Sequence, residues 1–380
     1  MKHLIVLLGP TGVGKTDLSI RLAQRFGASI VSADSRQIYQ GIEIGTAAPT
    51  PEQLAQVPHY FIGTHTLEQP YSAGQYELDA LQVIENLFEQ SNYVVLTGGS
   101  MMYIDAVCNG MDDIPTVSEE IRTHVQNLYQ TQGLPILQEM LKQLDPTHYK
   151  KVDLCNYRRV MHAVEVCLET GQPYSSLLTH SKKERPFSII KIGLNRPRPE
   201  LYERINQRVE IMIEDGLEEE AKRAYPYKHN NSLNTVGFKE WFDFWDGKIE
   251  SKERVIELIQ QNSRHYAKRQ LTWFNRDTDI TWFHPDDEAG IVSFIDESTN
   301  RWIDLIRSLS LSTCCWPKGK RARIIVESHN RRIVKSFRRW SVEAMQWKDI
   351  VIERRYLLWK RHYWYYYFCA AWRRFKHKAH

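Results

Sequence analysis

The sequence has few cysteines, and their spacing lacks the patterns that are typical of metal and disulfide sites. No two of the six cysteines form a Cys-x-x-Cys pair, so the spacing indicates neither a zinc site nor a disulfide framework. We therefore expect free thiols in a reducing compartment. The six residues are Cys108, Cys155, Cys167, Cys314, Cys315 and Cys369.

Long apolar runs are also absent. No stretch is long enough to cross a bilayer, and the first apolar segment begins at residue 3, which leaves no room for an export signal before it. These absences predict a cytoplasmic protein. The chain has 380 residues, of which 42% are hydrophobic, and this is enough for one large α/β core and a second unit.

An excess of positive charge is missing from most of the chain. Residues 311–380 contain 18 Lys and Arg against 4 Asp and Glu, whereas residues 1–310 contain 32 against 42. The composition is therefore not that of a uniformly basic nucleic-acid binder, although it leaves room for a local basic patch.

What is present is a phosphate-binding loop in its usual setting. The apolar run 4–8 predicts a buried parallel strand, and the motif Gly-x-x-x-x-Gly-Lys-Thr at 9–16 follows it and leads into a helix. The loop amides, the helix N-terminus and Lys15 together favour two linked phosphates. Thr16 has the hydroxyl that usually holds Mg²⁺, the expected cofactor. The expected diphosphate-binding residues of the loop are Gly9, Thr11, Gly12, Gly14, Lys15 and Thr16.

Two polar residues follow other predicted strands. Asp34 ends the segment 28–34, and Ser100 comes shortly after the segment 91–96. Because loops at the carboxyl ends of parallel strands meet in one crevice, we expect both residues and Gln37 beside the P-loop. Asp34 could accept a proton from a nucleophile, and Ser100 could reach the same crevice; each could instead cap a helix.

The order of the predicted elements indicates an α/β fold, a P-loop NTPase-like parallel sheet core with a helical insertion domain. We expect the first part of the core at 1–111 and the helical insertion, with an RNA-binding role, at 112–187. The core is completed by a strand and C-terminal helices at 188–290. A basic, aromatic extension of unknown order occupies 291–380.

Basic residues occur in three of the predicted helices. Arg204 and Arg208 stand one turn apart, where they could clamp a diphosphate, follow an RNA backbone or lie on a solvated face. Arg158 and Arg159 begin another helix. In 263–274, basic and aromatic residues alternate, which suits phosphate contact and base stacking but equally describes an aromatic core stripe with a charged outer face.

Together these motifs resemble the tRNA dimethylallyltransferase family over about the first 285 residues. The sequence departs from the usual family pattern at Ser100 (usually Thr), His162 (usually Arg) and Ala48 (usually Lys). The matching segments are Gly-Pro-Thr-Gly-Val-Gly-Lys-Thr at 9–16, Asp-Ser-Arg-Gln-Ile-Tyr-Gln-Gly at 34–41, Ile-Gly-Thr-Ala at 44–47, Tyr-Ser-Ala at 71–73, Thr-Gly-Gly-Ser at 97–100, Arg-Arg-Val-Met-His-Ala-Val-Glu at 158–165 and Tyr-Ala-Lys-Arg-Gln-Leu-Thr-Trp at 266–273.

The resemblance implies transfer of a dimethylallyl group from dimethylallyl diphosphate to the N6 amine of the adenosine 3′-adjacent to the anticodon in tRNA. Asp34 is then the general base, Ser100 a hydrogen-bonding group near the amine, and Arg204 a further ligand of the diphosphate. The anticodon stem-loop is the implied partner, and we expect a monomer without a membrane partner. The implied tRNA contacts are Ser35, Gln37, Thr46, Arg158, Arg159, Lys268, Arg269 and Gln270.

Two other functions stay open. A small-molecule P-loop kinase would hold ATP on the loop and use Asp34 as a base, with Arg158 and Arg159 in a lid. A non-catalytic RNA-binding protein would use a degenerate P-loop, against which the intact Lys15 and Thr16 argue. The tail from about residue 290 has no counterpart in the family pattern. The basic and aromatic residues of its part 321–380 could bind RNA, or the tail could be a poorly folded extension.

Overall fold

The computed structural model describes residues 2–179 and 181–311, with side chains described up to residue 300. The chain divides into two compact units, Met1–Ser293 and Phe294–His380. None of the helices in the described part has the length and hydropathy of a membrane span. The predictions for Cys314, Cys315, Cys369 and the segment 321–380 lie outside the described residues.

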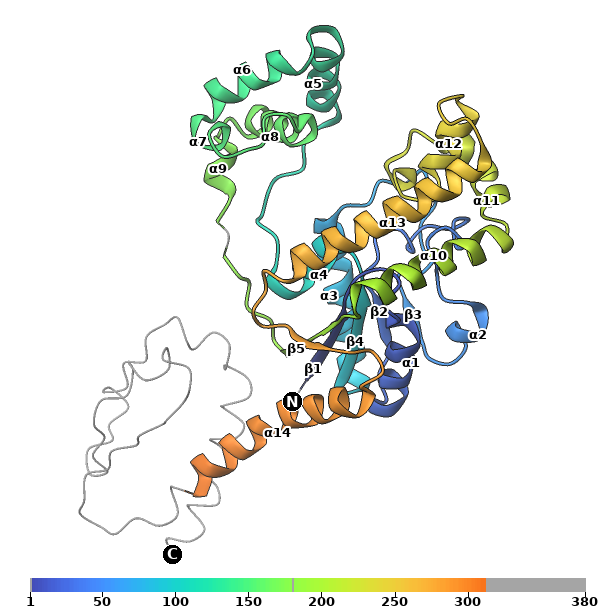
Figure 1. The fold of residues 1–380 in the computed structure, drawn as a ribbon. Coiled ribbons are helices and arrows are strands. Elements are labelled where there is room, and N and C mark those ends of the chain that lie inside the picture. Colours follow the sequence, from blue (N-terminus) through green and yellow to red (C-terminus); the bar gives the residue numbers. More distant parts are fainter. Residues whose placement is uncertain (1, 180, 312–380) are drawn as a thin grey trace, which may run out of the picture. The chain divides into compact units, whose positions relative to one another are not determined.

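A parallel sheet of six strands forms the centre of the first unit, in the order β3-β2-β4-β1-β5-β6 (Figure 1). Leu8 at the end of β1 is paired with Gly98 of β4 on one side and with Gly193 of β5 on the other. This sheet and its helices confirm the predicted α/β class. The strands are β1 (His3–Leu8), β2 (Ile30–Ser32), β3 (His59–Tyr60), β4 (Tyr93–Gly98), β5 (Ser188–Leu194) and β6 (Thr281–Phe283).

The apolar run 4–8 is the buried strand that its composition predicts. Each of its side chains is at most 1% exposed, because β1 has a strand on either side and helices over both faces. Strand β6 has no counterpart in the sequence prediction. Its three residues are only half-buried, and so short an edge strand leaves no alternating pattern.

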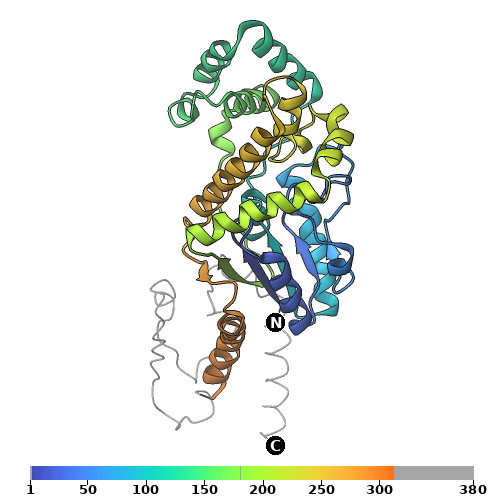
Figure 2. The same cartoon turned by 45° about the vertical axis from the view of Figure 1, so that its right-hand side comes forward.

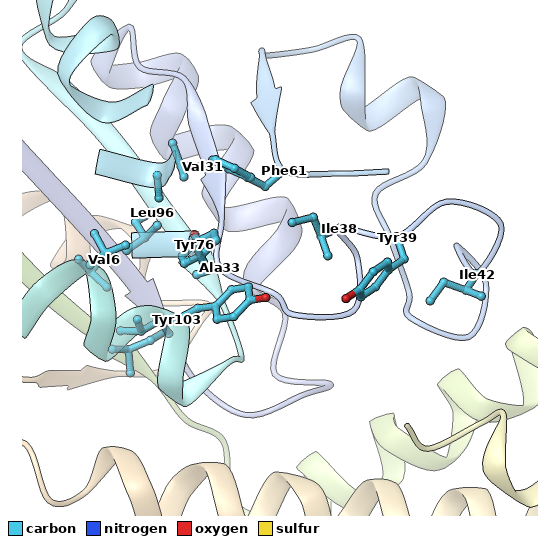
Figure 3. Close-up of a cluster of buried hydrophobic side chains, with 14 of the residues drawn as sticks. Val6, Val31, Ala33, Ile38, Tyr39, Ile42, Phe61, Tyr76, Leu96 and Tyr103 are labelled. Atoms are coloured by element: carbon cyan, nitrogen blue, oxygen red, sulfur yellow. The ribbon is translucent and has the colours of Figure 1, made fainter. Parts of the chain in front are cut away.

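Helices cover both faces of the sheet. On one face, Tyr76 and Tyr103 lie beside the strand residues Val6 and Leu96 (Figure 3). The Tyr76 hydroxyl donates to the Ser32 carbonyl oxygen at 2.8 Å, which ties this layer to β2. The opposite face is covered by α1. The helices concerned are α1 (Lys15–Phe26), α3 (Ala73–Gln90) and α4 (Met101–Asn109).

Two long helices, α10 (Arg198–Glu214) and α13 (Lys252–Phe274), pack side by side (Figures 1 and 2). A bond of 2.6 Å from Arg264 Nη1 to Asn206 Oδ1 joins them. Both helices contact the loop after β1, as described below. The remaining helices outside the 112–187 segment are α2 (Pro51–Leu54), α11 (Leu217–Ala224), η1 (Tyr225–Tyr227), η2 (Asn231–Leu233), α12 (Lys239–Trp245) and α14 (Glu288–Leu311).

Among the described residues of 112–187, helices are the regular elements that occur, and they have a hydrophobic core of their own. Val125, Leu137, Leu141, Val160 and Val164 are fully buried against one another. The Asn156 side chain accepts from Arg159 N at the start of α8. The helices are α5 (Glu119–Gln132), α6 (Leu134–Leu144), α7 (Pro146–Tyr149), α8 (Tyr157–Thr170) and α9 (Tyr174–Leu177).

Candidate active site

The loop between β1 and α1 has a conformation that depends on its glycines. Gly9, Gly12 and Gly14 have φ angles of 152°, 80° and 104°. A Cβ atom at Gly12 would lie 2.8 Å from the Ile205 side chain. Gly14 is the N-cap of α1 and leaves the first N–H groups without a side-chain cap. Within the described residues, the loop therefore presents unpaired backbone donors at a helix N-terminus, the usual setting for a phosphate.

Lys15 lies over this loop. Its Nζ donates to the carbonyl oxygens of Gly9 at 3.0 Å and Pro10 at 2.9 Å. Burial lowers the pKa of Lys15 to about 8; the nearby Asp34 carboxylate opposes the shift, and Arg208 adds to it. Only loop carbonyls hold the ammonium group within the described residues, so an anion in the loop would be a stronger partner.

The helix α10 brings two arginines to the same loop. The Arg204 Nε donates to the Gly12 carbonyl oxygen at 3.1 Å, and the Arg208 Nη2 donates to the Thr11 hydroxyl at 2.6 Å. Arg208 Nε is buried and has no hydrogen-bond partner in the described chain. Burial also lowers the pKa of the Arg208 guanidinium, against the attraction of Asp34. A half-buried cation whose Nε is buried and has no partner in the described chain suits an anionic ligand.

The sequence predicts Arg204 as a ligand of the diphosphate and leaves several roles open for Arg208. The structure places Arg204 on the exposed side of α10 and Arg208 deeper, against Thr11. The spacing of four residues puts both arginines on one helix face, but spacing alone does not tell which of the two is less exposed. Arg196, which the motifs did not indicate, donates from Nε to the Val13 carbonyl oxygen at 3.0 Å.

Asp34 follows β2 and lies in a turn. Its Oδ1 accepts from the backbone N–H of Arg36 at 2.9 Å and of Gln37 at 3.4 Å. No helix begins there, so the alternative of a helix cap is wrong. The other carboxylate oxygen, Oδ2, has no hydrogen bond within the described residues and is available to a substrate. Ser35, the next residue, is half-buried in the same turn.

Gln37 and Thr46 help to shape the loop that follows. The Gln37 Nε2 donates to the carbonyl oxygens of Thr46 at 3.2 Å and Ala47 at 2.9 Å, and Ala47 has a positive φ of 49°. The Thr46 hydroxyl donates to the Ile42 carbonyl oxygen at 2.8 Å. Both side chains are thus committed to the loop, and the Gln37 Oε1, at 3.5 Å from Ser32 Oγ, is the atom that remains for a base edge.

Ser100 is joined by a backbone hydrogen bond to Ala33, the residue before Asp34. Its N–H donates to the Ala33 carbonyl oxygen at 3.1 Å, so the turn after β4 touches the end of β2. Ser100 is 8% exposed, and although it occupies the N-cap position of α4, its hydroxyl makes no cap hydrogen bond. Within the described residues, the hydroxyl therefore has no cap bond and is available to another partner.

Helix α13 contributes residues of two kinds. Lys268 and Arg269 are exposed, with the Arg269 guanidinium 5.7 Å from the centre of the Tyr266 ring. Gln270 is buried and bonds to Thr11 and Gly99. Burial raises the pKa of Tyr266 to about 12, and the Asp34 charge adds to the shift. The motifs had placed Tyr266 on this helix without a role in the site.

The remaining predicted contacts are outside the crevice. Arg158 and Arg159 are exposed on α8, and Arg158 Nε donates to the Tyr157 hydroxyl at 3.1 Å. In the amide orientation that satisfies its neighbours, Asn234 accepts from Arg158 at 2.9 Å and 3.2 Å. His162, a departure from the family pattern, is exposed and 4.0 Å from Glu165. The structure does not bring these residues to the P-loop.

Among the described residues of the loop, the Thr16 hydroxyl is the expected protein ligand for a divalent cation. The Thr16 hydroxyl is at the first turn of α1 and makes no hydrogen bond in the described chain. Within the described ranges, no group of three or more His, Cys, Asp or Glu side chains could hold a metal by itself. This donor set fits Mg²⁺, which usually takes one or two protein ligands and completes its shell with phosphate oxygens and water.

Comparison with protein families and known proteins agrees with this geometry. The family model described as IPP transferase matches residues 37–277. The tRNA dimethylallyltransferase 2 of Parabacteroides distasonis is 56% identical over 298 residues, which are 78% of this chain and 99% of that protein. The tRNA dimethylallyltransferase 1 of Phocaeicola vulgatus is 58% identical over 292 residues, 77% of this chain and 97% of that protein.

Solved structures extend the comparison to the fold. The full-length tRNA isopentenylpyrophosphate transferase of Bacillus halodurans is 33% identical with a TM-score of 0.60, over 81% of this chain and 100% of that chain. A eukaryotic dimethylallyltransferase acting on tRNA is 25% identical with a TM-score of 0.69, over 80% of each chain. These similarities confirm the fold predicted from the motifs.

Proposed function

This chain belongs to the IPP transferase family, and we propose that it transfers a dimethylallyl group from dimethylallyl diphosphate to N6 of the adenosine 3′-adjacent to the anticodon in tRNA. The observation that carries the proposal is the position of Asp34. This carboxylate has one oxygen without a hydrogen bond in the described residues, and it follows Ala33, whose carbonyl oxygen accepts from Ser100 N. The turn after β4 also approaches Lys15, because a Cβ atom at Gly99 would lie 3.9 Å from its Nζ, so a nucleophile and a diphosphate ester would meet here.

The diphosphate binds in the P-loop. The free N–H groups at the start of α1, the Lys15 ammonium and the unpaired Nε of Arg208 are the donors that support this assignment. As the bond between C1 of the dimethylallyl group and the diphosphate oxygen breaks, the electron pair leaves with the diphosphate. Preformed donors stabilise the charge that grows on this leaving group.

The acceptor is an aromatic amine, a weak nucleophile because its lone pair is delocalised into the ring. As N6 bonds to C1, it becomes more acidic, and Oδ2 of Asp34 accepts its proton. The two backbone N–H groups at Oδ1 hold the carboxylate in place during this step. The Ser100 hydroxyl hydrogen-bonds near the amine and fixes its direction of attack.

The Thr16 hydroxyl would hold Mg²⁺ at this site. A bound Mg²⁺ would supply positive charge for the leaving diphosphate. The tRNA backbone contacts exposed cations of α8 and α13, namely Arg158, Arg159, Lys268 and Arg269. The target base must leave its stack in the RNA to reach Asp34. A tRNA substrate also favours the cytoplasm as the compartment and does not require more than a monomer.

The test combines the purified chain with Mg²⁺, labelled dimethylallyl diphosphate and unmodified tRNA, with labelled ATP as a parallel donor. We expect the label in tRNA, recovered after digestion as N6-isopentenyladenosine, and no transfer from ATP. Lys15→Ala should abolish transfer by removing the cation of the diphosphate site. Phosphate transfer from ATP to a small acceptor, without prenyl transfer, would instead identify a kinase.

A further inference from the structure

The side chain of Gln270 joins the two backbone segments that carry the two halves of the active site. Its Oε1 accepts from Thr11 N at 2.9 Å, and its Nε2 donates to the Gly99 carbonyl oxygen at 2.7 Å. Thr11 belongs to the P-loop, and Gly99 directly precedes Ser100. The side chain is 1% exposed, so one buried amide connects the diphosphate loop to the turn after β4.

The chemistry of the two partners requires an amide at this position. Thr11 offers a backbone donor and Gly99 a backbone acceptor, so the bridge must be an acceptor at one end and a donor at the other. A carboxylate could accept from Thr11 but would face the Gly99 carbonyl with a second negative oxygen. A hydrocarbon of the same length could make neither bond.

The absence of a side chain at Gly99 gives the Gln270 amide its space. A Cβ atom at Gly99 would lie 2.4 Å from Gln270 Nε2 and 3.9 Å from Lys15 Nζ. The glycine therefore makes room for the bridge, and the bridge lies next to the lysine of the diphosphate site. One turn further along α13, the Trp273 Nε1 donates to Asp105 Oδ2 of α4 at 2.9 Å, which holds the helix itself.

The bridge extends to the general base through backbone contacts. Ser100 N donates to the Ala33 carbonyl oxygen, and Ala33 immediately precedes Asp34. A shift of Gly99 relative to Thr11 would therefore move Ser100 and the end of β2 relative to the bound diphosphate. Displacements of about 1 Å between reacting groups are enough to slow a transfer reaction strongly.

We propose that Gln270 is a positioning residue that sets the P-loop against the turn carrying Ser100 and Asp34, and that it makes no contact with tRNA. The assignment deepens the proposed function and rests on it, because it gives Gln270 a role in aligning donor and acceptor. The RNA-facing residues of this helix are then the exposed neighbours Lys268 and Arg269.

The test uses two substitutions in the full-length chain. Gln270→Glu keeps the shape of the side chain and the bond from Thr11 N, but loses the bond to Gly99. Gln270→Met keeps the length of the side chain and loses both bonds. Each variant is compared with the wild type for binding of inorganic diphosphate with Mg²⁺ and of a synthetic anticodon stem-loop RNA, both by calorimetry, and for steady-state prenyl transfer. Lys268→Gln, two residues away on the exposed face, is the matched control.

We expect both Gln270 variants to bind diphosphate about tenfold or more weakly and to bind the RNA with the wild-type affinity. The KM for dimethylallyl diphosphate should rise and kcat should fall, whereas the KM for tRNA should not change. Lys268→Gln should show the reverse, with weaker RNA binding and unchanged diphosphate binding.

The pH dependence separates a positioning role from loss of folding. In the Gln270→Glu variant, the protonated carboxyl group can donate to Gly99 again, so the ratio of variant to wild-type diphosphate affinity should recover as the pH falls from about 8 to 5.5. Gln270→Met has no such group and should show no recovery. The ratio to wild type removes the titration of diphosphate itself from the comparison.

Weaker RNA binding by the Gln270 variants with unchanged diphosphate binding would overturn the proposal and make Gln270 a tRNA contact. Unchanged affinities together with an unchanged kcat would overturn it as well. If the wild type binds both ligands but transfers no dimethylallyl group, the proposed function fails. The two binding measurements still decide whether Gln270 positions the loop.

Discussion

At the scale of single residues, the proposed role of Asp34 as a base depends on a difference between its two carboxylate oxygens. Oδ1 is held by two backbone N–H groups, and Oδ2 has no partner within the described residues. Asp34→Asn keeps an acceptor for the turn and removes the base, so we expect folding to persist and kcat to fall by about 10²–10⁴. Single-turnover prenyl transfer measures this loss, and a rate within threefold of the wild type would exclude Asp34 as the base.

Lys15 gives the site a dependence on pH. Its folded pKa of about 8 lies below the ordinary value of 10.5, so the ammonium of the free protein loses its proton as the pH rises through 8. We expect diphosphate affinity to fall with rising pH above 8, by up to about tenfold per unit. Lys15→Gln should remove this dependence, apart from that of diphosphate itself. Calorimetry between pH 7 and 9 makes the comparison, and parallel profiles for both proteins would contradict the assignment.

The same shift has an effect on stability with a definite sign. Because burial lowers the pKa of Lys15, the unfolded chain binds more protons than the folded chain between pH 8 and the ordinary lysine value. The contribution of Lys15 to the free energy of unfolding therefore increases as the pH rises through this window. The buried cation costs stability at neutral pH, where its binding function needs it.

At the scale of elements, α10 presents two arginines that differ in burial. Arg208 has a buried, unpaired Nε and a lowered pKa, whereas Arg204 is exposed and bonds to Gly12. We expect Arg208→Gln to weaken diphosphate binding by about 10- to 100-fold with no loss of thermal stability, because it removes a desolvated charge. Arg204→Gln is the matched control and should weaken binding less. If both substitutions weaken diphosphate binding equally, the different burial of the two arginines does not decide how much each contributes to that binding.

Helix α13 shows how an element can serve two purposes. The sequence pattern of alternating basic and aromatic residues allowed either RNA contact or a core stripe, and the helix has both kinds of face. Lys268 and Arg269 are exposed, whereas Gln270 and Phe274 are buried. A helical period of 3.6 residues separates the two faces within a single turn, so the neighbours of a buried residue in sequence can be exposed.

At the scale of the whole molecule, the described parts of the site span Gly9 to Gln270, and the family match ends at residue 277. A chain that ends after residue 311 retains all of these residues. We expect it to keep prenyl transfer within about threefold of the full chain, since the 298 matched residues are 99% of a curated relative. Loss of activity in this shorter chain, with its fold intact by circular dichroism, would give residues 312–380 a part in the function.

The elements and the chemical class of the site could be predicted from the sequence because their signals are local. The P-loop motif, the buried strand before it and the carboxylate at Asp34 each occupy a short, continuous segment. The strand expected in the segment 188–290 is β5, because a run of mostly apolar residues between polar segments has few alternatives. The short edge strand β6 and the burial of Arg208 had no such local signal.

The amino-acid sequence by itself thus determined the fold class, the phosphate-binding loop and the family resemblance. Only the tertiary structure decided which side chains complete the site. Gln270 is 259 residues from Thr11 and 171 from Gly99, and its two bonds exist because α13 packs over the carboxyl ends of β1 and β4. Backbone partners leave no trace in residue type, so a contact of this kind cannot be inferred from sequence spacing.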